Sequence, residues 1–157
     1  DIAIVDQSFV DNTKIPIVWI DHHEPRELEN IKIFNPRLND KNDNTPVTYL
    51  CHQVVKQNLW LAAAGCIGDW HYPDFMDKFK EKYPNLLKID SKDPGDILFN
   101  TKLGTLVRIL SFVLKGRTGD VKKCYKILTR INDPYVILDQ TTSQGKFIYR
   151  KFSKINE

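Results

Sequence analysis

Three short apolar runs near the start of the chain, at residues 2–5, 15–20 and 31–34, constrain its fold more than any other feature. Each run is rich in β-branched residues, is continuously apolar rather than alternating, and ends at a polar residue. Such runs are typical of parallel strands that are covered on both faces. We therefore predict an α/β fold, mainly a parallel sheet flanked by helices. The link at residues 7–14 is short for a crossover, so either it holds one compressed helical turn or the strands beside it are not neighbours.

Helical patterns fill much of the remaining chain. Thr45 and Pro46 have the residue types of an N-cap and a first helical position, which predicts a helix after them. Apolar periodicity, or an apolar surface all round, predicts further helices at residues 59–68, 75–83, 102–115 and 120–131. We interpret residues 85–100 as a loop that turns at residues 93–95, and Gly145 as the middle of a closing hairpin.

Composition narrows the class of protein. The chain has 157 residues, of which 41% are hydrophobic and 27% charged, which is typical of one globular domain and excludes a disordered chain. No apolar run reaches the length of a membrane span and no signal peptide opens the chain, so we expect no membrane partner and a cytoplasmic location. The three cysteines lack metal-site spacing, which favours reduced thiols.

Charge is unevenly distributed, although the net charge is only +3. Residues 1–45 hold nine acids and five bases, whereas residues 102–130 hold eight bases and one acid, Asp120. An acidic region can hold metal and a basic one can follow a nucleic-acid backbone, although a solvated helix face is the common alternative. The residues predicted to bind nucleic acid are Lys102, Arg108, Lys115, Arg117, Lys122, Lys123, Lys126 and Arg130.

The strongest functional signal is the triplet Asp21, His22 and His23, here named the DHH triplet, which follows the run at residues 15–20. Functional groups of parallel sheets collect beyond the carboxyl ends of the strands. Of two adjacent imidazoles at such a position, one can bind a metal ion and the other can meet substrate, while the aspartate can orient a ring. The alternative is a solvated loop with two incidental histidines.

Two more acids stand where such a site would need them. Asp6 closes the first apolar run, and Asp69 follows Gly68 at the end of the apolar helix at residues 59–68. Taken singly, each acid is more simply explained as a helix cap or a turn residue. His71, two residues past Asp69, either supports a ligand of the site or belongs to the loop.

Together these motifs resemble the DHH phosphoesterase superfamily, which includes RecJ-type exonucleases, oligonucleotide phosphodiesterases and family II pyrophosphatases. Asp6 resembles the second acidic motif, the DHH triplet the third, and Gly68 with Asp69 the fourth. The likeness continues through the Asn-Pro pair after residues 31–34 and spans nearly the whole chain. It is greatest with archaeal RecJ-like single-strand exonucleases.

The resemblance implies a phosphodiesterase with a two-manganese centre, with magnesium as an alternative metal. Asp6 would bridge the two ions, and His22 and Asp69 would complete the ligands of the second ion. His23 would contact the scissile phosphate, with Asp21 supporting the histidines. Two such ions activate a bridging water for attack on a phosphodiester bond of single-stranded DNA or RNA.

The family's first motif, an Asp-x-Asp pair, does not precede Asp6, and the family's glycine-rich C-terminal substrate domain does not follow. We therefore expect the chain to be part of a longer nuclease and to be inactive alone. The resemblance implies a metal-site core at residues 1–100, a basic helical segment at residues 101–131, and the start of a linker at residues 132–157.

Two other functions stay open. A DHH fold can be a catalytically inert scaffold in a replication complex, so replication or repair proteins are expected partners beside single-stranded nucleic acid. Hydrolysis of a small substrate, such as pyrophosphate or a cyclic dinucleotide, is the other alternative, but it needs no extended basic surface. Of the remaining candidates, Trp70 either stacks on a base or lies at the surface, and His52 is expected at the surface. The aromatic residues expected to pack are Trp19, Trp60, Phe112, Tyr125 and Phe147.

Overall fold

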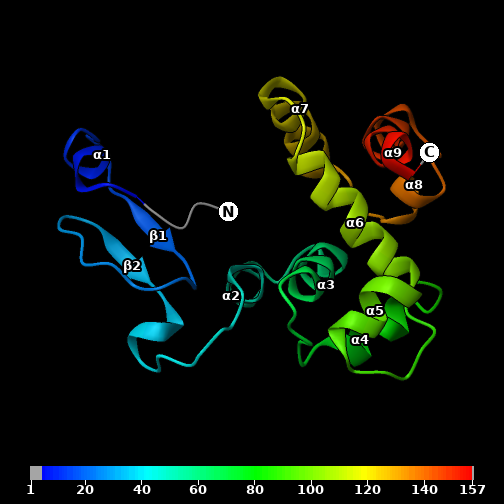
Figure 1. Cartoon of the computed structure of the whole chain (residues 1–157), viewed down its shortest axis with the longest axis horizontal. Coiled ribbons are helices and arrows are strands. Elements are labelled where there is room, and N and C mark those ends of the chain that lie inside the picture. The colour runs from blue at the N-terminus through cyan, green and yellow to red at the C-terminus, as the bar shows by residue number, and fades with distance from the viewer. Residues whose placement is uncertain (1–4, 157) are drawn as a thin grey trace. The chain divides into compact units, whose positions relative to one another are not determined.

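The computed structural model describes residues 5–156, and the chain forms two compact units, residues 1–55 and residues 56–157. The first unit combines a small sheet with short helices (Figure 1). Its elements are α1 (Gln7–Asp11), β1 (Val18–Ile20), β2 (Lys32–Phe34), the 3-10 helix η1 (Pro36–Leu38) and α2 (Val47–Val55).

The two strands of the first unit pair in parallel, as the sequence predicts. Val18 lies opposite Lys32, and Ile20 opposite Phe34. Strand formation is confined to the last residues of the two predicted runs, and the run at residues 2–5 falls almost wholly outside the described residues. The α/β class is confirmed, but the described chain is mostly helical with one two-stranded sheet, so a core made mainly of sheet is not confirmed.

The second unit is helical throughout its described residues. The predicted buried helix at residues 59–68 is confirmed, and the other predicted helices agree to within a few residues. The elements are α3 (Leu59–Gly68), α4 (Met76–Lys82), α5 (Pro94–Asn100), α6 (Lys102–Leu114), α7 (Thr118–Leu128), α8 (Tyr135–Leu138) and α9 (Ser143–Asn156).

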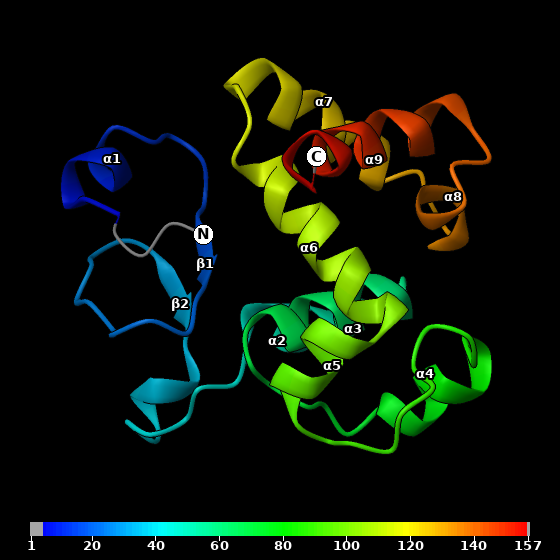
Figure 2. The ribbon, with the colours of Figure 1, turned by 45° about the vertical axis from the view of Figure 1, so that its right-hand side comes forward.

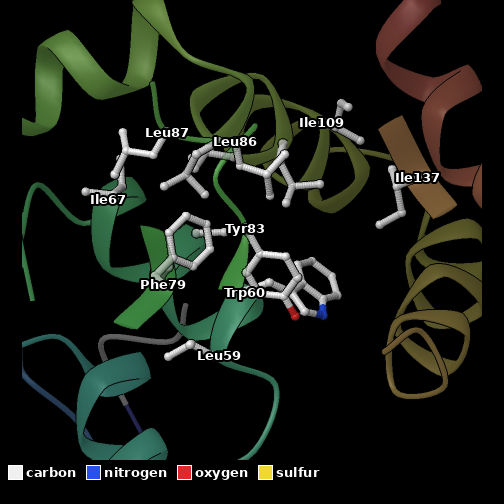
Figure 3. Packing of buried hydrophobic residues seen from close by; sticks show 14 of the residues in the cluster. Leu59, Trp60, Ile67, Phe79, Tyr83, Leu86, Leu87, Ile109 and Ile137 are labelled. Atoms are coloured by element: carbon white, nitrogen blue, oxygen red, sulfur yellow. The ribbon is translucent and has the colours of Figure 1, made fainter. Parts of the chain in front are cut away.

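A continuous apolar core holds this unit together. Trp60 of α3, Phe79 of α4 and Leu103 of α6 are fully buried in it. Figure 3 shows the rings of Phe79, Tyr83 and Trp60 beside one another. Burial of such large side chains is the main source of folding free energy in a domain of this size.

The interpretation of residues 85–100 as a loop is wrong over residues 94–100, where α5 (Pro94–Asn100) forms. Asp93 is the N-cap, its side chain accepts a hydrogen bond from the Asp96 N–H at 2.8 Å, and Pro94 is the first helical residue. Asp-Pro-Gly is a turn signal, but an aspartate before a proline is equally a helix start. Ile97 decides between them, because the helix buries it completely in the core.

The predicted hairpin around Gly145 is also wrong, because this glycine lies inside α9. A Cβ atom at Gly145 would clash with the backbone carbonyl oxygen of Val136 in α8. The glycine therefore allows α9 to approach α8 closely rather than making a turn.

Residues 132–157, which the resemblance assigns to the start of a linker, contribute to the core of the second unit. Ile137, Ile148 and Phe152 are buried there, and α9 packs on α6. Among residues 5–156, no single helix is both long enough and apolar enough to cross a membrane. The helices α5 and α6 meet these two criteria only when they are counted together, and the pair is bent by 85°.

Candidate functional site

The DHH triplet lies directly beyond the carboxyl end of β1. Asp21 continues the pairing of the strands, since its backbone N–H donates to the carbonyl of Phe34 at 3.0 Å. The residue is 4% exposed, and its Oδ1 lies 2.8 Å from His23 Nδ1. Because a carboxylate only accepts hydrogen bonds, His23 Nδ1 carries the proton, and the ring is held in one tautomer.

Asn35 fixes the same histidine from the neighbouring strand. It follows β2 directly, is 7% exposed, and its Nδ2 donates to the backbone carbonyl of His23 at 2.9 Å. Its Oδ1 accepts a hydrogen bond from the Arg37 N–H at 3.0 Å, which starts η1. In the sequence, Asn35 closes an apolar run and belongs to the Asn-Pro pair of the resemblance, and neither feature predicts a contact with His23. Its placement beside the DHH triplet follows from the parallel pairing of β1 and β2.

The two histidine rings contact each other. Their centroids are 4.8 Å apart with planes inclined by 67°, and both side chains are half-buried. Such an edge-to-face contact restricts the rotamers of both rings. The polar cluster at this strand end therefore consists of Asp21, His22, His23 and Asn35.

Asp6 occupies the N-cap position of α1 but does not act as a cap. Its side chain makes no capping hydrogen bond, and the residue is exposed. The sequence favours a helix cap as the explanation of Asp6. Asp6 does stand at the N-cap position, but its carboxylate accepts no capping hydrogen bond. The side chain keeps the capacity to bind a cation.

Asp69 ends α3 inside a tight C-terminal turn. The N–H of Trp70 donates to the carbonyl of Ile67 at 3.2 Å, and the N–H of His71 donates to that of Cys66 at 2.9 Å. This is a Schellman motif, in which Trp70 takes the left-handed position (φ 58°) that glycine usually occupies. The turn leaves the Asp69 side chain exposed and Trp70 65% exposed.

Trp70, in this strained conformation, lies beside Gly95. A Cβ atom at Gly95 would lie 3.2 Å from Cζ3 of the Trp70 ring, so the ring covers the space that this glycine leaves open. A non-glycine residue with positive φ costs about 1–2 kcal/mol, and such strain is common beside functional residues. This exposed ring next to Asp69 agrees with the surface position that the sequence allows.

Cys66 lies one helical turn before Asp69 and is fully buried. Burial raises the pKa of its thiol from the ordinary 9.0 to about 12, and the negative charges of Asp69 and Asp74 add to the shift. The thiol therefore stays protonated at neutral pH and cannot be a ready metal ligand or nucleophile.

The predicted metal ligands are divided between the units. Asp6 and His22 belong to the first unit and Asp69 to the second. Within the described residues of either unit, no group of three or more His, Cys, Asp or Glu side chains meets at metal-binding distance. The ligand set of Asp6, His22 and Asp69 therefore stays a prediction. His71 and His52 are both half-buried and in contact with other groups.

The basic segment is mostly a solvent-facing surface, with one exception. Arg108 is half-buried in α6, where its Nη2 donates to Thr105 Oγ1 at 3.2 Å and its guanidinium lies 6.0 Å from the ring of Phe152. It therefore contributes to packing within the unit. The exposed members of the predicted set are Lys102, Lys115, Arg117, Lys122, Lys123, Lys126 and Arg130.

No family model, curated protein or solved structure matches the chain.

Proposed function

We propose that the chain carries the metal-site region of a phosphodiesterase, a single-strand DNA or RNA exonuclease of the RecJ type. The observation that supports this best is the hydrogen bond between the buried Asp21 carboxylate and His23 beyond a parallel strand. A buried carboxylate that orients a half-buried imidazole is common in sites that handle phosphate or metal. An incidental loop histidine would need neither Asp21 nor Asn35 to hold it.

His23 is the proposed contact to the scissile phosphate. With Nδ1–H held by Asp21, its Nε2 is the nitrogen that meets substrate, and a protonated ring donates from Nε2 to a phosphate oxygen. The Asp21 carboxylate stabilises that positive charge, and Asn35 keeps the backbone of His23 in place. These groups would counter the charge that builds up on the phosphate during hydrolysis.

His22, Asp6 and Asp69 are the proposed ligands of manganese, or of magnesium in its place. Their chemistry fits the metal, because imidazole and carboxylate donors suit manganese and the two acids are exposed. When bound, a pair of such ions lowers the pKa of a bridging water and neutralises phosphate charge. The remaining ligands are expected from an Asp-x-Asp pair in a longer form of the protein.

The exposed basic segment supports a polymeric substrate over a small one. Seven exposed cations on α6, on α7 and in the segments that follow these two helices exceed what pyrophosphate or a cyclic dinucleotide requires. The experiment must then distinguish an enzyme from a catalytically inert scaffold.

The decisive experiment measures manganese-dependent release of nucleotides from a single-stranded oligonucleotide by a form extended to include the predicted Asp-x-Asp pair. We expect His23→Ala and Asp21→Asn to lower kcat by roughly a hundredfold or more, since each removes charge stabilisation in the transition state. His52→Ala, a matched histidine of α2, should leave kcat unchanged. Activity that survives both substitutions would refute the proposed role of the DHH triplet.

The chain by itself should release nucleotides at least about a thousandfold more slowly than the extended form, because a two-metal hydrolysis needs both ions. Equal rates would contradict the expectation that the first motif is missing. If the extended form binds manganese but releases nothing, the scaffold function replaces the enzyme.

A further inference from the structure

Tyr125 contradicts the expectation that it packs in the core. It lies in the middle of α7, and 67% of its surface is exposed. The core side of this helix is supplied instead by Cys124, which is fully buried, with Ile127 and Leu128 half-buried beside it.

Two exposed lysines of α7 stand close to Tyr125 in the sequence. Lys122 precedes it by three positions and Lys126 follows it by one, and both are exposed. Residues three and four apart on a helix are neighbours on its surface, so Lys122 adjoins both Tyr125 and Lys126. All three residues are exposed to solvent. Of the large hydrophobic side chains described on α7, Tyr125 is the one that is exposed.

A second pair of cations joins α7 to α9. The ammonium of Lys123 lies 4.4 Å from the centroid of the Phe147 ring, and the guanidinium of Arg150 lies 5.7 Å from it. Both lie within the range of cation–π attraction, so one half-buried ring holds a basic residue from each helix. Figure 2 shows α7 and α9 within the second unit, where they pack on each other. The basic surface of α7 thus continues onto α9, which composition in residues 102–130 did not indicate.

We propose that Tyr125 stacks on a base of single-stranded nucleic acid while Lys122 and Lys126 bind the flanking phosphates. An aromatic platform between cations is the arrangement that binds single strands without sequence preference. A membrane surface fits less well, because an interfacial helix needs a broad apolar face and the apolar side of α7 faces the core. The inference rests on the proposed polynucleotide substrate but is independent of the metal site.

Binding is measured with this chain in the presence of a chelator and at low salt, so that hydrolysis and metal play no part. The probes are a labelled oligothymidylate, an abasic strand of the same length, and vesicles rich in anionic lipid. We expect Tyr125→Ala to weaken binding of oligothymidylate by roughly tenfold and to leave the abasic strand unaffected, because stacking needs a base. Tyr125→Phe should retain the affinity, and Phe99→Ala, which removes another exposed ring, should change nothing.

Lys122→Gln should weaken both strands alike and reduce the slope of affinity against salt by about one. An unchanged affinity of Tyr125→Ala for oligothymidylate, or an equal loss on the abasic strand, would overturn the stacking. Binding to vesicles that depends on Tyr125 would assign the surface to membranes instead. Since no step involves catalysis, loss of this proposal leaves the phosphodiesterase proposal intact, and the reverse also holds.

Discussion

The two units of this chain are held together in different ways. In the second unit, buried apolar side chains from all its helices form one core. In the first, Val10 and Pro46 are the buried apolar residues among those described, and the sheet leaves Val18 57% and Phe34 61% exposed. The buried polar residues are here instead, namely Asp21 and Asn35.

This difference separates stability from function. The apolar residues of the sheet and of α2 line a groove of about 780 Å³, whereas parallel sheets are ordinarily covered on both faces. The polar cluster at the strand ends nevertheless has defined geometry, because hydrogen bonds rather than packing fix it. Most of the candidate site thus lies in the unit with the smaller core, whereas the second unit has the larger core, the basic surface and the proposed ligand Asp69.

A pair of leucine substitutions tests the comparison most strongly. Leu103 is fully buried in α6, so Leu103→Ala should lower the free energy of unfolding by about 2–5 kcal/mol. Leu38 in the first unit is 58% exposed, and Leu38→Ala should change it by no more than about 0.5 kcal/mol. Urea denaturation followed by tryptophan fluorescence measures both. Similar losses would show that apolar packing also holds the first unit.

The converse test removes the buried carboxylate of the first unit. Asp21→Ala should destabilise the pairing of β1 and β2 by about 1.5–3 kcal/mol, since a charged hydrogen bond to His23 is lost. Amide hydrogen exchange in the two strands reports the change. Glu24→Ala is the control, because Glu24 is exposed and its ion pair with the half-buried Arg37 at 3.0 Å is worth at most about 1 kcal/mol. Equal protection in both variants would contradict a supporting role for Asp21.

Two glycines sharpen what close packing does in the second unit. Gly145→Ala should cost about 1–3 kcal/mol, because the new methyl group meets the backbone of Val136 and forces α8 and α9 apart. Gly119→Ala in α7 meets nothing within 4 Å and should stabilise by up to about 1 kcal/mol through helix propensity. Thermal unfolding of both variants shows whether each substitution lowers or raises stability. A change in the same direction in both would be inconsistent with the close approach of α9 to α8.

The smallest effect concerns the buried thiol. The pKa of Cys66 is raised on folding, so the stability that its neutral form contributes is complete below about pH 9 and is lost as pH rises toward 12. Cys66→Ala should flatten the fall of stability over this range. At neutral pH a thiol reagent should modify the half-buried Cys51 well before Cys66. Early modification of Cys66 would mean that α3 opens readily.

Patterns whose cause is local were predictable from the sequence. The helix at residues 59–68 is apolar on every side, so no packing partner was needed to infer it. The polar residues after β1 and β2 were expected at one end of a parallel sheet, and Asp21, His23 and Asn35 do meet there. The resemblance, and not periodicity, assigned metal and phosphate roles to these residues, and those roles stay predictions.

What the sequence determined by itself was which segments could form helices and strands, and which polar residues would follow a strand. Only the tertiary structure decided between two uses of the same residue type. Pro94 and Gly145 can each mark a turn, and burial of Ile97 and the approach of α8 place both in helices. Tyr125 fits a buried or an exposed face equally well in a periodic pattern, and Cys124 took the core position. The physical reason is that side-chain burial depends on neighbours distant in the chain, whereas capping and backbone preference depend on adjacent residues.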